Sequence, residues 1–144
     1  MGVVDTAAGI GHYALVHPSA ELAAAYWEHH RRATSTNRAD RLSQGDVFWA
    51  WEEIHEHVSD HPESAVDVLV IVAEAAPDDA ALAYLGAGPV EALLHPSVST
   101  TVVDQVEHAA VHSETFRKAL RCAWFDDHVP SDVATRLRRF GDPY

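Results

Sequence analysis

Residues 63–76 read Glu-Ser-Ala-Val-Asp-Val-Leu-Val-Ile-Val-Ala-Glu-Ala-Ala, and the conformation of this segment decides the architecture of the chain. The β-branched residues between Val66 and Val72 favour a strand. A strand needs a partner, however, and only residues 98–103 offer a second candidate. Two isolated strands make a marginal sheet. A central helix that is buried on most sides explains the run better, so the segment predicts an all-α protein.

Helix signals on both sides of this segment support the same fold class. Side chains that cap helix N-termini precede stretches with apolar residues at steps of three and four, and prolines stand where further helices begin. The capping residues are Ser19, Ser43 or Asp46, Asp78, Ser97 or Ser99, and Ser113, and the prolines are Pro62, Pro89 and Pro130. Thr34 to Asp40 is polar and predicts a loop. We expect about seven or eight antiparallel helices in a compact bundle. A stack of helical hairpins is an alternative arrangement of the same helices.

The domain organisation follows from where these signals begin. Residues 1–17 show no clear periodicity and predict a loosely structured N-terminal arm. Residues 18–144 predict a single helical domain. Within this domain, Gly86-Ala87-Gly88-Pro89 predicts a tight corner between two helices, in which Gly86 or Gly88 takes a positive φ.

Composition excludes several classes of protein. The chain has 144 residues, one cysteine and a formal net charge of -12. A single cysteine forms no disulfide within the chain, and a free thiol is typical of a cytoplasmic protein. The excess of acids argues against a nucleic-acid partner. The sequence contains no stretch of 18 apolar residues, so we expect no membrane span. No motif for a cofactor is present, and the absence of a catalytic constellation favours a non-enzymatic protein.

Several segments resemble a known group of sequences. They are Trp49-Ala50-Trp51-Glu52-Glu53, Leu82 to Leu94 with its Ala-Gly-Pro-Val-Glu-Ala-Leu-Leu end, and Phe116 to Leu120. Over about residues 47–125 the chain is similar to a family of small, uncharacterised bacterial helical proteins. In that family a tryptophan-glutamate helix precedes an Ala-Gly-Pro-hydrophobic-Glu-x-Leu-Leu segment. The resemblance implies a helical fold and no particular activity.

Charge is segregated along the chain. Residues 42–116 contain no Lys or Arg, whereas all ten basic residues lie before or after them. The acids of this stretch either pair in space with the two basic ends or form a surface that binds a basic protein partner, as an inhibitor or immunity protein does. For the second case we predict that the surface is formed by Trp49, Glu52, Glu53, Glu56, Asp60, Glu63, Asp78 and Asp79.

Two alternative functions remain open. The first is a metal-binding protein or metal-dependent enzyme, because His55, His57 and His61 cluster along the chain and Asp104, His108 and His112 share a helical face. No second Glu-x-x-His motif accompanies Glu52 and His55, so we predict no metal ligands or cofactor. The second alternative is a structural subunit of an oligomer.

Histidine also predicts a dependence on pH. The chain has 11 histidines, and at their usual pKa of about 6.5 most of them become charged by about pH 5.5. The net charge then approaches zero, and binding to a basic partner is expected to weaken.

Overall fold

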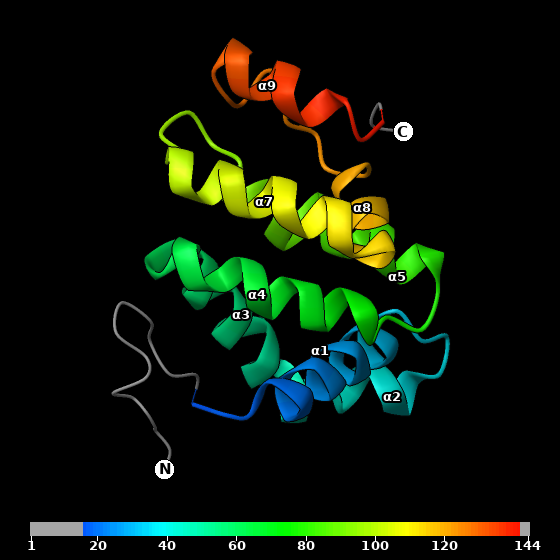
Figure 1. Cartoon of the computed structure of the whole chain (residues 1–144). Helices are drawn as coiled ribbons and strands as arrows, with labels where there is room; N and C mark the ends of the chain where they lie inside the picture. Colours follow the sequence, from blue (N-terminus) through cyan, green and yellow to red (C-terminus); the bar gives the residue numbers. More distant parts are fainter. Residues whose placement is uncertain (1–15, 142–144) are drawn as a thin grey trace.

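The segment that decides the fold is helical. The computed structural model describes residues 16–141, and helix α4 (Pro62–Glu74) covers most of the segment. No strand occurs in this part of the chain, which confirms the all-α prediction. Figure 1 shows α4 in the middle of the molecule, with α7 on one side of it and α1 on the other.

The helices follow one another through short connections. Before α4 lie α1 (Ser19–Ala33), α2 (Arg38–Leu42), a 3₁₀ turn (Gln44–Val47) and α3 (Phe48–Asp60). After it lie α5 (Asp79–Leu85), a π-helical turn (Gly86–Val90) and α6 (Glu91–Leu93), which form one unbroken run. The remaining helices are α7 (Thr100–His112), α8 (Glu114–Leu120) and α9 (Ser131–Arg138). The expected arm, residues 1–17, lies outside the described residues except for its last two.

The core is built around the apolar side of α4. This helix contacts α1, α3, α7 and α8, and its fully or nearly buried residues are Ala65, Val66, Val68, Leu69, Val72 and Ala73. At its C-terminal end, where carbonyl groups lack partners within the helix, the indole Nε1 of Trp27 donates a buried 2.8 Å hydrogen bond to the carbonyl of Val72. The helix is therefore held along its length and at its end.

Most of the predicted helix starts agree with the structure. The side chains of Asp78, Ser99 and Ser113 each accept a hydrogen bond from a backbone N–H in the first turn of α5, α7 and α8. Pro62 lies at the first position of α4, and only His61 separates it from the end of α3 at Asp60. These starts were predictable because a capping side chain or a proline acts locally.

Three predictions near the N-terminus of the domain were wrong. Ser19 lies inside α1, whose N-cap is Pro18, and neither Ser43 nor Asp46 caps α3 through its side chain. The segment predicted as a loop contains the start of α2, where the side chain of Asn37 accepts a hydrogen bond from Ala39 N–H. This short helix has no buried residue, and so no apolar pattern marks it.

The predicted corner at Gly86–Pro89 was also wrong. The chain continues through it as a π-helical turn, in which the N–H of Glu91 reaches the carbonyl of Gly86 five residues earlier. Pro89 lacks an N–H and cannot complete an ordinary α-helical ladder, and one wide turn accommodates it. Neither Gly86 nor Gly88 has a positive φ, which among the described residues is found only at Gly141.

Close packing, and not backbone conformation, explains the glycine at position 86. A Cβ added there would lie 2.0 Å from the carbonyl oxygen of Ala119 in α8 and 2.9 Å from the Cβ of Cys122. At Gly88 the same Cβ would meet nothing within 4 Å. The structure therefore has room for a side chain at position 88 but not at position 86.

We predict that Gly86→Ala destabilises the protein by about 3 kcal/mol, since α8 must move away from α5 to admit the methyl group. Gly88→Ala is expected to be neutral or to stabilise by up to about 1 kcal/mol, because alanine favours a helix over glycine. Urea denaturation of both variants measures the difference. Equal effects at the two positions would contradict the packing explanation.

Candidate functional site

The basic ends of the chain reach part of the acidic stretch. Arg136 of α9 donates hydrogen bonds to Asp104 and Glu107 of α7, and the Arg136 guanidinium lowers the pKa of the Glu107 carboxyl. Lys118 lies 3.8 Å from Asp79 and 4.0 Å from Glu114. Pairing in space with the basic C-terminal end therefore accounts for several acids of the stretch.

The acids of α3 and α4 behave differently. Within residues 16–141, six exposed carboxylates on these two helices have no ion pair and no hydrogen bond to a side chain. We call them the unpaired acids: Glu52, Glu56 and Asp60 on α3, and Glu63, Asp67 and Glu74 on α4. Residues four and seven positions apart share one face of a helix, so each helix carries one row of negative charge.

Four of the eight predicted site residues belong to this set. Glu52, Glu56, Asp60 and Glu63 are exposed and lie on two helices that pack against each other. The prediction missed Asp67 and Glu74, although their spacing from Glu63 places all three on the outer face of α4. This spacing of four and seven residues was the sequence signal that could have identified Asp67 and Glu74.

Two further predicted residues hold the segment that precedes α1. The carboxylate of Glu53 accepts hydrogen bonds from the backbone N–H of Val16 and His17, at 3.1 and 3.4 Å, and lies 2.7 Å from Nδ1 of His17. The His17 ring lies against half-buried Trp49, with 4.0 Å between the ring centroids. In this structure Glu53 and Trp49 contact residues 16 and 17.

The last two predicted residues, Asp78 and Asp79, lie at the start of α5. Asp78 Oδ1 accepts a 2.8 Å hydrogen bond from Ala81 N–H and so caps the helix. Asp79 faces Lys118, as described above. Both side chains thus have partners within the described chain, unlike the unpaired acids.

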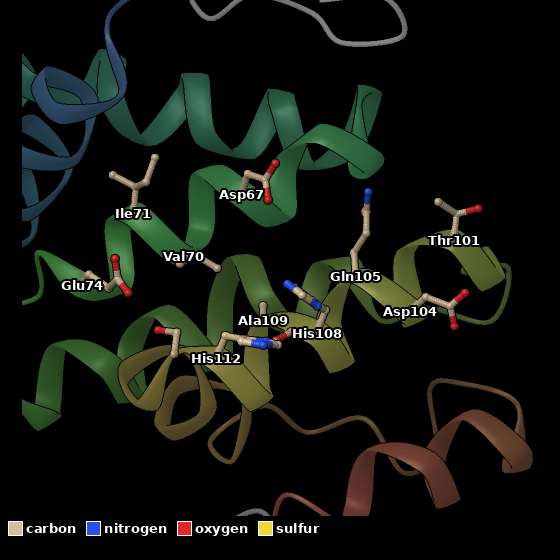
Figure 2. A pocket seen from close by; sticks show the side chains of 11 residues that line it. Asp67, Val70, Ile71, Glu74, Thr101, Asp104, Gln105, His108, Ala109 and His112 are labelled. Atoms are coloured by element: carbon tan, nitrogen blue, oxygen red, sulfur yellow. The ribbon is translucent and has the colours of Figure 1, made fainter.

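A groove of about 650 Å³ lies beside the row of acids on α4. Figure 2 shows that its lining side chains come mainly from two helices, α4 and α7. The apolar lining residues are Val70 and Ile71 on α4 and Ala109 on α7. The polar ones are Asp67, Glu74, Thr101, Asp104, Gln105, His108, His112 and Ser113.

The histidines of α7 interact with each other and with the backbone. The rings of His108 and His112 stack with 4.1 Å between centroids, and Nδ1 of His112 lies 2.8 Å from the carbonyl oxygen of His108. Asp104, the third member of the predicted helical face, is bonded to Arg136. In the described part of the chain, no group of three or more His, Cys, Asp or Glu side chains is arranged to hold a metal ion.

The histidines of α3 lie against aromatic and buried surfaces. The His55 ring stacks on Trp51, with 3.8 Å between centroids. His57 is buried, and its Nε2 lies 2.8 Å from Oγ of Ser64 in the first turn of α4. Burial lowers the pKa of both histidines below the usual value.

Cys122 borders a smaller pocket between α5 and α8. This pocket measures about 410 Å³, and its lining also includes Leu82, Ala83 and Lys118. Burial raises the pKa of the Cys122 thiol, so the neutral form is favoured.

A comparison of sequences places most of the chain in one family. Residues 37–142 match DUF6869, which is described as a family of unknown function. The chain belongs to this family. The match confirms the predicted resemblance to an uncharacterised family and extends beyond residues 47–125 to include α2 and α9. No curated protein and no solved structure matches the chain.

None of the helices in residues 16–141 has the length and apolar character needed to cross a membrane.

Four buried or half-buried histidines change the expected dependence on pH. Desolvation lowers the pKa of His29, His30, His55 and His57. Fewer histidines are therefore charged at pH 5.5 than the usual pKa predicts, and the net charge stays more negative. Because these groups keep their usual pKa in the unfolded chain, the unfolded state binds more protons below about pH 6.5.

We predict that the free energy of unfolding falls from pH 7.5 to pH 5.5, and that this fall is smaller in His57→Gln than in the wild type. The variant has lost one group that resists protonation in the folded state. Urea denaturation at both pH values measures the two differences. His112→Gln, at an exposed position on α7, is the control and should show the same fall as the wild type. A fall of equal size in all three proteins would contradict the assignment to His57.

Proposed function

We propose that this protein is a non-enzymatic interaction protein that binds, and so neutralises, a basic protein partner through the unpaired acids of α3 and α4. The single observation that carries the proposal is that these six carboxylates have no cation among the described residues, whereas several other acids of the same stretch, such as Asp79 and Asp104, do. A basic partner supplies the missing positive charge, and complementary charge speeds association and selects the partner.

The spacing of these acids supports the proposal. Glu52 and Glu56, Glu56 and Asp60, and Glu63 and Asp67 each stand four residues apart on one helical face. Each such pair of like charges costs a helix about 0.2–0.5 kcal/mol. Rows of like charge are unfavourable for folding when no cation lies nearby. Such rows are expected where a partner supplies the cations on binding.

The partner belongs to the class of basic proteins, and we place the interaction in the cytoplasm because the one cysteine of the chain, Cys122, has a free thiol. Toxins, nucleases and other basic effectors are the kinds of protein that an acidic inhibitor of this size neutralises.

We predict that replacing four of the unpaired acids weakens partner binding by about 30-fold. The variant is Glu52→Gln, Glu56→Gln, Glu63→Gln and Asp67→Asn. At about 0.5 kcal/mol for each exposed charge contact, four changes remove about 2 kcal/mol, which is a factor of about 30 in affinity. Immobilised wild type and variant are each incubated with a lysate of the cell that encodes the protein, and retained proteins are eluted with a salt gradient.

The matched control removes the same charge from other exposed positions, with Glu21→Gln, Glu114→Gln, Asp127→Asn and Asp132→Asn. The control is expected to retain the basic protein that the wild type retains and to release it at the same salt concentration. Equal loss in both variants would mean that net charge, and not the surface of α3 and α4, governs binding.

A further inference from the structure

The groove between α4 and α7 has an apolar floor beside unpaired charge. Ile71 is 39% exposed although it is a large apolar residue, and Val70 and Ala109 line the same hollow. Asp67 and Glu74 belong to the row of unpaired acids and also line the groove. A hydrophobic strip with carboxylates along one edge is the complement of a helix that is apolar on one face and basic at its border.

The chain itself shows how a basic residue of an amphipathic helix pairs with acids of α7. Helix α9 buries Val133, Ala134 and Leu137 and directs Arg136 to Asp104 and Glu107 of α7. Figure 1 shows α9 beside α7, on the side away from α4. Asp104 and Glu107 of α7 therefore already have a basic partner in α9, whereas Asp67 and Glu74, which line the groove from α4, have none among residues 16–141.

The spacing of the charges sets the pattern that an occupant must have. Asp67 and Glu74 are seven residues apart, which is about two helical turns and about 10 Å along α4. Val70 and Ile71 lie between them. A helix that runs along the groove can pair with both acids when two of its basic residues are seven positions apart. These basic residues must border an apolar stripe, which then faces Val70 and Ile71.

We propose that the groove between α4 and α7 binds one amphipathic helix of the partner protein, with apolar residues on Val70, Ile71 and Ala109 and Lys or Arg beside Asp67 and Glu74. This inference rests on the proposed function, because it takes the partner to be basic. It adds that the recognised segment is a single helix. It also adds an apolar contribution to the binding free energy, which does not depend on salt.

The test uses two synthetic peptides of 15 residues and identical composition. In the first, leucines at steps of three and four form one face, and lysines flank them. In the second, the same residues are shuffled so that no apolar face exists. Fluorescence anisotropy measures the binding of each peptide to the wild type, to Ile71→Gln, and to Val111→Gln. Val111 is the matched control, since it is 54% exposed on α7 and does not line the groove.

We expect the amphipathic peptide to bind the wild type about tenfold more tightly than the shuffled one. Ile71→Gln is expected to weaken its binding about fivefold, and Val111→Gln to leave it unchanged. Thermal unfolding of both variants, with melting temperatures close to that of the wild type, shows that the loss is not due to unfolding.

Equal binding of the two peptides, or equal effects of the two substitutions, would overturn the inference about the groove. The proposed function would then still stand if the four-acid variant bound both peptides more weakly than its charge-matched control. If the four-acid variant and its control bound the peptides equally well, the proposed function would fail together with the inference. A wild type that forms a dimer, and an Ile71→Gln variant that is monomeric, would also overturn the inference by showing that a second copy occupies the groove.

Discussion

The structure depends on the burial of one very apolar helix among four others. Helix α4 contacts α1, α3, α7 and α8, and six of its thirteen residues are buried. An isolated strand of the same sequence would leave half of these side chains exposed and its backbone unpaired, which explains why the β-branched residues of Val66 to Val72 adopt a helix here. Tertiary burial overrides the local preference for a strand.

The same constraint leaves one face of α4 to solvent. The helix needs polar residues there, and Glu63, Asp67 and Glu74 supply them. The cations of the chain lie before and after residues 42–116, and Arg136 of α9 and Arg139 just beyond it pair with acids of α7. The outer face of α4 therefore carries negative charge beside the groove that Val70 and Ile71 line. Fold and candidate site thus have one physical origin.

The sequence was sufficient for features that depend on neighbouring residues. Caps at Asp78, Ser99 and Ser113 and the break at Pro62 were predictable because each acts within about four residues. Features that depend on contacts between distant segments were not predictable. The pairing of Arg136 with Asp104 spans 32 residues. The close approach of Gly86 to Ala119, which rules out a side chain at Gly86, spans two helices. The partners of Glu53 and Trp49 also come from a distant segment, at Val16 and His17.

The central claim is that the open face of α4 is part of the surface through which the protein binds a basic partner. Chemical-shift mapping tests it most directly: ¹⁵N-labelled protein is titrated with the lysine-leucine amphipathic peptide, and the backbone amide signals are followed. The account predicts that the largest shift changes fall on Asp67, Val70, Ile71 and Glu74 of α4 and on the facing residues Gln105 and His108 of α7. Changes confined to the pocket beside Lys118 and Cys122, or spread evenly over all exposed acids, would contradict it.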